Sequence, residues 1–498
     1  MPTNTNAMMK RIIVIGALSA GLASGLCSGS DYYVDSQAAS SGDGTQASPF
    51  ATIQEGVDAA SSGDTVYLKG SLYVSQASQC VVIPADKPEL KLAKWGTDRF
   101  SIEVDNDFMK NMANKASTNI ITICSQSNTI SGINFIYHRN SLGLQNYGNG
   151  SFVFFCTNYQ TVVGCRFYRP PNSAEAPGYQ GVDRLISGRS WGGDKNNANG
   201  QDYITIRDCV FENTFGGRGD IHKYPIGVGN YATIANCVFS NCWSMATAIQ
   251  NGKFNYHTIV SNVLILAAMD GNRWLAPGGE RAGVFTSAYG GMGKGEVAYN
   301  IFVGRNRDFP LFNYGRYDGF DAGKVSFHHN TVIGFDCLFS GGLTIWNSAK
   351  QKFDTDIYGN NKALFEFADN IIDANVLFYE NATNAAHQAS AIKSGSVLWN
   401  NAVCLTNNDV IATGAATKSA MYNLFDKLSI SNNVFLTCLP EFVVTNDIHS
   451  ADFYRPRLRL GQDADLRRIG WRGAGNEYPP FIGALEPTIL GSLRIYLR

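Results

Sequence analysis

The sequence predicts an all-β protein, a parallel β-solenoid of about ten or more coils with one short helix at its start. Three observations predict it: a short phrase that recurs along the chain, the uneven spacing of its copies, and a composition suited to strands and turns. The phrase is a large apolar residue, a Cys or Asn three positions later, and a second large apolar residue two positions after that. Its ten copies, the first with Ile in the middle place, are Ile130/Ile133/Phe135, Val162/Cys165/Phe167, Ile206/Cys209/Phe211, Ile234/Cys237/Phe239, Ile259/Asn262/Leu264, Val297/Asn300/Phe302, Phe327/Asn330/Val332, Phe367/Asn370/Ile372, Leu398/Asn401/Val403 and Ile430/Asn433/Phe435.

The spacing and the composition both favour coils over globular domains. Middle residues of neighbouring copies are between 25 (Cys237 to Asn262) and 44 (Cys165 to Cys209) positions apart. A constant strand and corner, joined by connections of variable length, is typical of a solenoid with insertions between coils. The 51 Gly, 15 Pro and 16% charged residues suit many strands and turns. No Pro/Ser-rich linker interrupts residues 120–440, so we expect one elongated domain, with ten coils spanning about 50 Å.

Stacking of the coils would bring the middle residues of the phrase into one column. Cys165, Cys209 and Cys237 would lie together, followed by the Asn residues of the later copies. An Asn at a corner can donate its side-chain amide to the next coil and so satisfy polar groups that a tight turn leaves unpaired.

The N-terminal 30 residues predict an exported protein. Lys10 and Arg11 precede an apolar run at 12–26, and Ser28-Gly29-Ser30 offers small residues for cleavage before Asp31. Two alternatives are a lipoprotein processed at Cys27, which Leu26 disfavours, and a retained membrane helix, for which the run is short and rich in Gly and Ser. We therefore expect residues 1–30 to be a signal peptide, with no transmembrane span left after cleavage.

Ten cysteines remain after cleavage, an even number in a compartment expected to be oxidising. One interpretation is a set of disulfides or metal ligands. The other, which we favour, is that cysteines in the repeated phrase are small buried apolar residues, because no CxxC pair or His/Cys cluster with zinc spacing occurs.

The segments on either side of the repeats predict the two ends of the solenoid. Residues 31–73 contain a strand at Tyr32–Val34, an amphipathic helix with Ile53, Val57 and Ala60 on one face, and a strand at Thr65–Leu68. Such a helix would cover the open edge of the first coil. Residues 466–487 contain Ile482-Gly483-Ala484, an expected closing strand, which leaves 488–498 as a C-terminal tail.

In its opening segment, its repeats and its closing phrase, the chain resembles secreted right-handed parallel β-helix proteins of the pectate-lyase-like superfamily. The resemblance implies a single-stranded right-handed parallel β-helix at 31–487. It also implies a long concave face for an extended extracellular polysaccharide, with chemistry supplied by side chains of successive coils and inserted loops. Members include pectate, alginate and chondroitin lyases, glycoside hydrolases, epimerases, viral tailspikes and adhesins, so the fold by itself does not select an activity.

The first candidate site is a set of charged and polar residues that fall at similar distances after the third, fourth and fifth copies of the phrase. They are Arg218, Asp220, His222, Lys223, Asn251, Lys253 and Arg273. Cleavage of a uronate polymer needs a cation that neutralises the carboxylate and a base that removes the C5 proton. Lys223 or His222 would be the base and Arg273 or Arg218 the neutralising group, while Asp220 would help to hold a Ca²⁺ ion. Lys253 and Asn251 would bind the substrate; alternatively, 216–225 is a surface loop whose charges are merely solvated.

The second candidate site is the segment 304–323, where Arg307, Arg316 and Tyr317 stand among further aromatic and acidic residues. Rings can stack on sugar faces, and Arg can bind hydroxyl or carboxylate groups. A loop of this composition can equally cover the edge of a core.

Other classes of function lack support in the sequence. The net charge is -1 and the pI about 6.7, which gives no basis for nucleic-acid binding. No Walker motif, GxSxG elbow or Rossmann fingerprint occurs in its proper context, so no nucleotide or organic cofactor is expected. The His328-His329 pair lies in an expected strand, where alternation would point one ring inward and one outward.

Three functions remain open. The first is an exported polysaccharide lyase acting on an acidic polymer by β-elimination, which the basic cluster at 218–273 favours. The second is a noncatalytic glycan-binding or adhesion rod. It is favoured because the sequence contains neither the acidic calcium stretch with a Ser-Lys step of alginate and chondroitin lyases, nor the vWiDH signature of pectate lyases, nor the NTD, DD and GHG steps of polygalacturonases. The third is a glycoside hydrolase.

Overall fold

The computed structural model describes most of the chain outside its termini and its longer connections. The described residues are 29–97, 99–105, 119–138, 151–170, 184–188, 201–213, 224–242, 246–248, 254–266, 285–287, 292–304, 307, 310–314, 324–341, 345–347, 352–354, 364–380, 395–406, 411–413, 428–459, 483–485 and 488–490. Within these ranges, no helix has the length and apolar character needed to cross a membrane.

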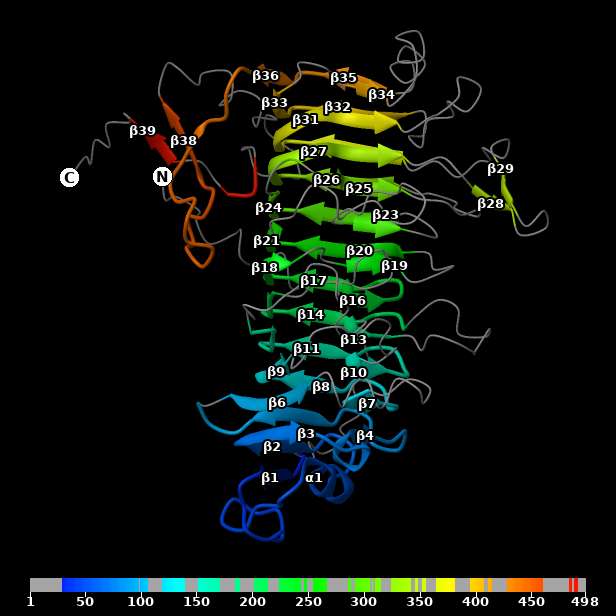
Figure 1. Ribbon diagram of the computed structural model, residues 1–498, viewed down its shortest axis with the longest axis vertical. Coiled ribbons are helices and arrows are strands. Elements are labelled where there is room, and N and C mark those ends of the chain that lie inside the picture. Colours follow the sequence, from blue (N-terminus) through cyan, green and yellow to red (C-terminus); the bar gives the residue numbers. More distant parts are fainter. Residues whose placement is uncertain are drawn as a thin grey trace, which may run out of the picture.

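The chain winds into a stack of coils built from two long parallel sheets, as the sequence predicts (Figure 1). Among the described residues, sheet A has 13 strands: β1 (Asp31–Asp35), β2 (Thr65–Lys69), β5 (Lys91–Lys94), β8 (Thr129–Ser131), β11 (Thr161–Val163), β14 (Thr205–Arg207), β17 (Thr233–Ala235), β20 (Phe254–Val260), β23 (Met292–Ala298), β26 (Lys324–His328), β30 (Leu364–Ala368), β32 (Ser396–Trp399) and β35 (Leu428–Ser431). Each strand pairs in parallel with the strands of the coils before and after it.

Sheet B has 21 strands in the described part of the chain and consists of two rows. The first row follows sheet A in each coil: β3 (Ser71–Val74), β6 (Phe100–Asp105), β9 (Ile133–His138), β12 (Arg166–Tyr168), β15 (Val210–Glu212), β18 (Val238–Cys242), β21 (Val263–Leu266), β24 (Ile301–Val303), β27 (Thr331–Gly341), β31 (Ile371–Glu380), β33 (Ala402–Leu405) and β36 (Val434–Leu436). The second row is β4 (Val81–Ile83), β7 (Ile121–Ile123), β10 (Ser151–Phe155), β13 (Arg184–Ser187), β16 (Tyr224–Val228), β19 (Ala246–Ala248), β22 (Phe285–Ser287), β25 (Pro310–Tyr314) and β34 (Ile411–Thr413). The long strands β27 and β31 pass through both rows.

The corner between sheet A and the first row is short because one residue in each coil adopts a left-handed conformation. Early coils use Gly132 and Gly164, and later coils use non-glycine residues with φ between 53° and 59°: Asp208, Asn236, Ser261, Tyr299, His329, Asp369, Asn400 and Asn432. This conformation is unfavourable for residues with a Cβ. Hydrogen bonds at each corner compensate for it.

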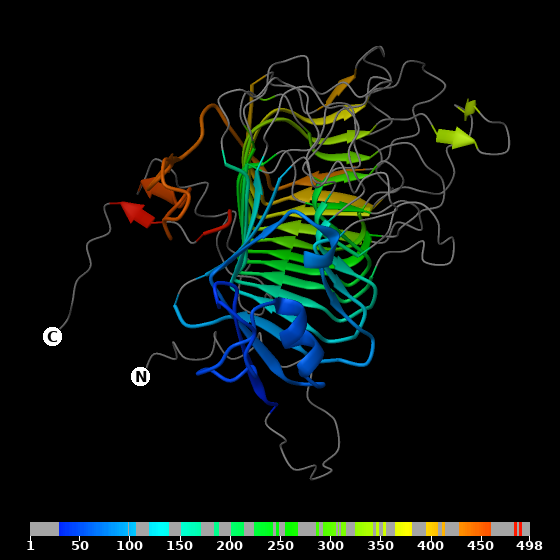
Figure 2. The ribbon, with the colours of Figure 1, turned by 60° about the horizontal axis from the view of Figure 1, so that its bottom comes forward.

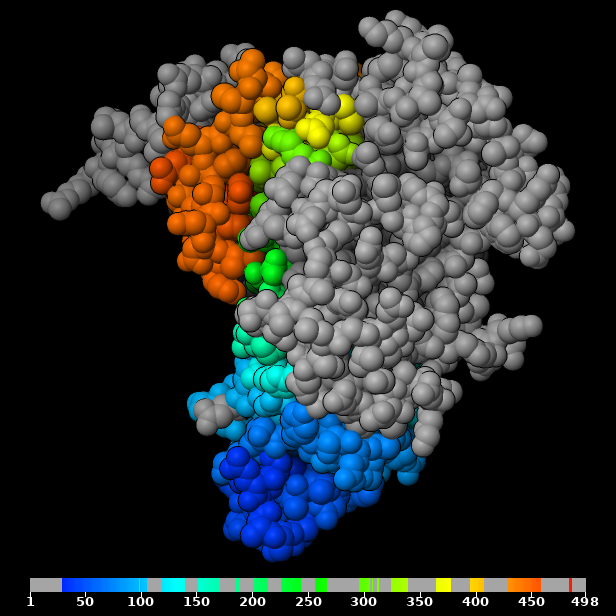
Figure 3. Space-filling view, viewed as in Figure 1, coloured from blue at the N-terminus to red at the C-terminus, as the bar shows by residue number. Residues whose placement is uncertain are grey.

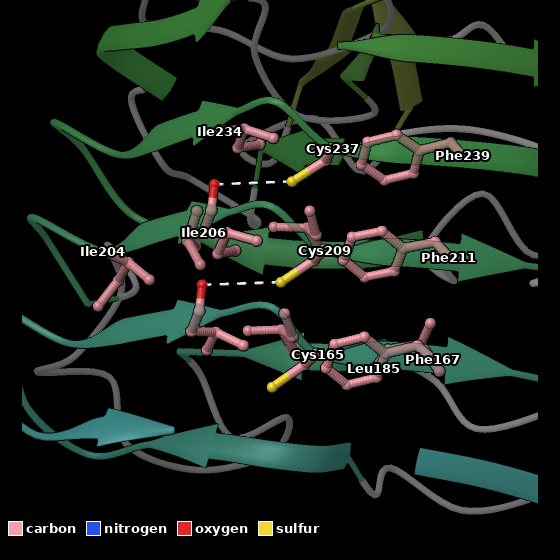
Figure 4. Close-up of a cluster of buried hydrophobic side chains, with 14 of the residues drawn as sticks. Cys165, Phe167, Leu185, Ile204, Ile206, Cys209, Phe211, Ile234, Cys237 and Phe239 are labelled. Atoms are coloured by element: carbon pink, nitrogen blue, oxygen red, sulfur yellow. Dashed lines mark hydrogen bonds between the residues drawn. The ribbon is translucent and has the colours of Figure 1, made fainter. Parts of the chain in front are cut away.

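The Cys and Asn residues of the repeated phrase form the predicted column and supply these hydrogen bonds. Asn262 donates both its backbone N–H (2.9 Å) and its Nδ2 (3.0 Å) to Oδ1 of Asn300 in the next coil. The same pair of bonds repeats through Asn330, Asn370, Asn401 and Asn433. In the earlier coils, the buried thiols of Cys165, Cys209 and Cys237 lie 3.7–3.8 Å from a carbonyl oxygen of the preceding coil. Figure 4 shows these contacts for Cys209 and Cys237.

The core fills the space between the two sheets and is continuous along the stack. Phe135, Phe167, Phe211 and Phe239 stack with ring centroids 4.8, 5.0 and 4.5 Å apart. All four are fully buried. Each phenyl group thus packs on its equivalent in the next coil, which fixes the register of the strands that carry it.

The expected helix at the N-terminal end is present as α1 (Ile53–Ala59), and a single 3-10 turn, η1 (Ala77–Gln79), follows it among the described elements. Thr52 and Glu55 form a capping box at the start of α1. Gln54 accepts a hydrogen bond from the N–H of Val82 in β4 (2.9 Å) and donates one to its carbonyl (3.1 Å). Because these groups belong to the first strand of the second row, the helix satisfies part of an open sheet edge.

The C-terminal segment lies along the flank of the stack, which differs from the closing strand that the sequence predicts (Figures 2 and 3). Ala484 donates its N–H to Thr331 Oγ1, and Gly483 donates to the carbonyl of Asp369. These partners belong to coils before the last one, so this phrase docks on the side of the first row instead of sealing the end. A three-stranded sheet accompanies it, formed by β37 (Glu441–Phe442), β38 (Pro456–Arg459) and β39 (Thr488–Leu490). A two-stranded sheet, β28 (Ile345–Asn347) with β29 (Lys352–Asp354), belongs to the connection after β27.

Candidate functional site

The connections of each coil are of two kinds, and only the longer kind has room for catalytic or sugar-binding side chains. The corners from sheet A to the first row are two residues long in most coils, and the column described above occupies them. Longer connections join the first row to the second row and the second row to sheet A, for example 267–284 between β21 and β22 and 381–395 between β31 and β32. The second row therefore has insertions attached at both ends of its strands, and it is the candidate substrate-binding face.

All predicted site residues belong to connections attached to neighbouring strands of the second row. Arg218, Asp220, His222 and Lys223 precede β16, Asn251 and Lys253 follow β19, Arg273 precedes β22, and Arg307, Arg316 and Tyr317 flank β25. The strands β16, β19, β22 and β25 pair in that order, roughly 4.8 Å apart. Except for Arg307, these residues lie outside the described part of the chain, so their roles stay predictions.

Arg307, the predicted sugar ligand that the structure describes, is bound to a carboxylate of its own chain. Its Nη2 lies 2.7 and 2.8 Å from the two carboxylate oxygens of Asp373, two coils further along the stack. Asp373 also accepts the N–H of Gly334 (2.9 Å), and its side chain is only 4% exposed against 33% for Arg307. A buried carboxylate with two charged contacts and a backbone donor is well compensated. Arg307 thus fastens the connection before β25 to β31, and its charge is already neutralised.

Sequence reasoning missed Asp373 because nothing near it in the sequence indicates its partner. Asp373 follows the strand residues of an ordinary repeat and is separated from Arg307 by 66 positions. Burial raises the pKa of the nearby Tyr454 phenol, and the negative charge of Asp373 raises it further. The signal available in the sequence was that Asp373 places a carboxylate at a strand position where the alternating pattern predicts an apolar residue.

A second polar cluster lies beside the corner of sheet A, with two buried histidines and a Glu296 side chain that is 44% exposed. His328 Nε2 lies 3.1 Å from Oε1 of Glu296, and its Nδ1 lies 3.0 Å from Nδ1 of His329. The hydrogen bond from His328 lowers the pKa of Glu296. Alternation along the strand predicts that one ring points outward, yet both histidines are at most 1% exposed; the strand ends at His328, and His329 occupies the left-handed corner.

No group of three or more His, Cys, Asp or Glu side chains in the described ranges is arranged to hold a metal ion. Asp220, the predicted Ca²⁺ ligand, lies outside those ranges. The calcium site therefore stays a prediction.

An exposed aromatic stack runs along the corner between the second row and sheet A. Tyr159, Tyr203, Tyr231 and Tyr256 have ring centroids 4.7, 4.6 and 4.7 Å apart and are 40–50% exposed. A threonine follows two positions after each of them, and these threonines pair in register on sheet A. The inner rings cover one another, so a sugar could stack only on the two end faces. The stack therefore stabilises the corner more than it offers a binding surface.

Comparison with solved structures identifies the fold. No family model and no curated protein matches the sequence. Among solved structures, the pectate lyase Pel9A superimposes with a TM-score of 0.51 over 93% of this chain and 98% of its own, at 12% sequence identity. The fold is that of the pectate-lyase-like parallel β-helices.

Two further solved structures match over most of their length. A PL6 family polysaccharide lyase from Pseudopedobacter saltans matches with a TM-score of 0.46 and 12% identity, over 77% of this chain and 90% of its own. A rhamnogalacturonan lyase matches with a TM-score of 0.41 and 14% identity, over 88% and 98%. At these identities the similarity is one of backbone architecture.

Proposed function

We propose that this protein is an exported polysaccharide lyase that cleaves an acidic, uronate-containing polysaccharide by β-elimination. The observation that supports this most is that each of four neighbouring second-row strands, β16, β19, β22 and β25, has a connection of five or more residues attached to at least one of its ends. The cationic candidates of the chain belong to those connections. The fold shared with a pectate lyase agrees with a polysaccharide substrate, and the N-terminal 30 residues agree with export.

The proposed chemistry assigns one task to each candidate. Arg273 or Arg218 pairs with the uronate carboxylate and so acidifies the proton on C5. Lys223 or His222, in its unprotonated form, takes that proton, the bond between C4 and the glycosidic oxygen breaks, and a double bond forms between C4 and C5. The departing oxygen takes up a proton to complete the new chain end. Lys253, Asn251, Arg316 and Tyr317 bind neighbouring sugars, and Arg307 positions the connection before β25.

The test is an assay of the purified protein on alginate, pectate, chondroitin, ulvan and neutral glycans, with and without Ca²⁺ because Asp220 is a proposed ligand. Ultraviolet absorbance of the unsaturated uronate and new reducing ends are measured together. Absorbance that Lys223→Ala or His222→Ala abolishes would support the lyase and locate its base. A matched control is Lys91→Ala, an exposed lysine on sheet A outside these connections, which should leave the rate unchanged.

Two other results would replace the proposal. Reducing ends without absorbance would identify a glycoside hydrolase. Neither signal on any polymer, together with retention on one of the glycans in a binding assay, would identify a noncatalytic glycan-binding rod.

A further inference from the structure

Two cysteines, Cys124 and Cys156, differ from the cysteines of the repeated phrase in the placement of their sulfur atoms. Cys124 follows β7 and Cys156 follows β10, and these strands pair in parallel with Ile123 opposite Phe155. The ladder continues one residue further, because Cys156 donates its N–H to the carbonyl of Ile123 and Cys124 donates to that of Ile83. The two cysteines therefore occupy the same position in consecutive coils. Their Sγ atoms lie 3.1 Å apart.

The cysteines of the repeated phrase do not share this arrangement. Cys165, Cys209 and Cys237 also occupy equivalent positions, yet each thiol contacts main-chain carbonyl oxygens, one in the preceding coil and one two residues before it. All three are fully buried, whereas Cys124 and Cys156 are partly exposed. An oxidant can therefore reach the Cys124 and Cys156 pair and not the column inside the core.

We propose that Cys124 and Cys156 form a disulfide that joins two consecutive coils near the N-terminal end of the stack. Neighbouring parallel strands are about 4.8 Å apart. That separation falls within the range of about 4.4–6.8 Å that disulfide-linked Cα atoms span, so the bond needs little backbone movement. The site lies outside the candidate substrate connections and is independent of the proposed lyase activity.

The reaction consumes an oxidant that the protein itself does not hold. Both S–H bonds break, one S–S bond forms, and two electrons and two protons pass to a disulfide of an oxidoreductase or of a small thiol, which is reduced to two thiols. The proposed export would bring the chain to a compartment that supplies such a disulfide. Burial, with a smaller contribution from the neighbouring Cys124 thiol, raises the pKa of Cys156 to about 12 in the folded chain. Because the thiolate is the reactive form, the bond should form mainly while these coils are still folding.

The experiment is a thiol count on the full chain, made once after export into an oxidising compartment and once after refolding with oxidised glutathione. Free thiols are alkylated in denaturant, and peptides are mapped by mass spectrometry with and without prior reduction. We expect Cys124 and Cys156 to escape alkylation until reduced and to appear as one cross-linked peptide. Cys165, Cys209, Cys237 and Cys242 should be alkylated in both samples.

The two samples separate failure of the disulfide from failure of export. A cross-link in the refolded sample alone would support the disulfide and contradict export, whereas alkylation of both cysteines in both samples would overturn the disulfide. As a second readout, a reductant should lower the melting temperature of the wild-type protein and leave that of the double variant Cys124→Ser/Cys156→Ser unchanged. Equal melting temperatures of the wild type with and without reductant would also count against it.

Discussion

At the scale of single residues, the stacked Asn side chains contribute more hydrogen bonds to the fold than the stacked Cys side chains do. Asn330 is fully buried, and its Oδ1 accepts both the N–H and the Nδ2 of Asn300 while its own Nδ2 reaches Asn370 and two carbonyls. Replacement by Ala removes the acceptor of the buried Asn300 N–H and the donor to the carbonyl of Val297, whereas Asn300 Nδ2 keeps the carbonyls of Ile259 and Ala298. We expect Asn330→Ala to lower the free energy of unfolding by roughly 3 kcal/mol, measured by urea denaturation.

A thiol at the same position of an earlier coil provides the control. The Cys209 sulfur makes weak contacts with carbonyl oxygens, at 3.2 and 3.7 Å. Cys209→Ala should therefore cost about 1 kcal/mol, mainly through lost packing. Equal losses in the two variants would show that the side-chain amides add nothing beyond volume.

His257 predicts how stability depends on pH. It is 1% exposed, its Nε2 lies 2.6 Å from the carbonyl of Gly229, and burial lowers its pKa from 6.5 to about 3. Between these values the unfolded chain binds a proton at His257 and the folded chain does not. The contribution of His257 to the free energy of unfolding is therefore greatest above pH 6.5. It falls toward pH 3, by up to about 1.4 kcal/mol for each pH unit.

The variant His257→Gln isolates this contribution, because Gln can donate to the same carbonyl but does not titrate. Unfolding free energies of both proteins are measured from pH 7 to pH 4. We expect the wild type to lose stability relative to the variant as the pH falls. Parallel curves would mean that His257 is protonated in the folded state.

At the scale of elements, α1 contains a glycine, Gly56, and the first coil leaves no space there for a larger residue. A Cβ at Gly56 would lie 2.8 Å from Val34 Cγ2 and 2.8 Å from Val66 Cγ1, and both valines are fully buried. In an exposed helix, Gly→Ala stabilises by about 1 kcal/mol. Here we expect Gly56→Ala to destabilise by about 1–3 kcal/mol and to displace the helix.

Hydrogen exchange measured along the chain checks this expectation. Amides at the C-terminal end of α1, such as that of its C-cap residue Ala60, whose N–H bonds to the Gly56 carbonyl, should exchange faster in Gly56→Ala. Amides of β24 should be unaffected, because each coil contacts mainly its neighbours. Asp58→Ala, on the exposed face of the same helix, should leave exchange in the first coil close to that of the wild type.

The elements divide into those that local sequence predicts and those that it does not. The phrase around Cys209 specifies a strand, a corner and a strand within eight residues, so stacking equivalent copies correctly gave the sheets and the column. The fold and the capping helix were thus predictable. The Arg307–Asp373 pair was not, because it joins residues of different coils whose spacing depends on connections without a repeat. The remaining candidate residues lie in such connections, and no local pattern sets their geometry.

At the scale of the whole molecule, the C-terminal segment contacts several coils at once, whereas each coil contacts mainly its neighbours. Phe453 is 1% exposed and packs in one cluster with Ile301 of β24 and Ala484, while Leu439 and Phe442 pack beside Ile371 and Ala402. A single stretch of chain therefore contacts the first row from β21 to β36. It covers apolar side chains on the outer face of that row, which would otherwise be open to solvent.

This arrangement predicts that the C-terminal segment can be released while the coils persist. Phe453→Ala removes the largest buried side chain of that contact, a change that typically costs about 3–5 kcal/mol. We expect limited proteolysis to cut 440–459 faster in this variant while far-ultraviolet circular dichroism stays that of the wild type. Phe435→Ala is the matched control, because Phe435 is 53% exposed and should leave the cleavage rate unchanged. Loss of the β signal together with faster cleavage would instead mean that the segment and the coils unfold as one unit.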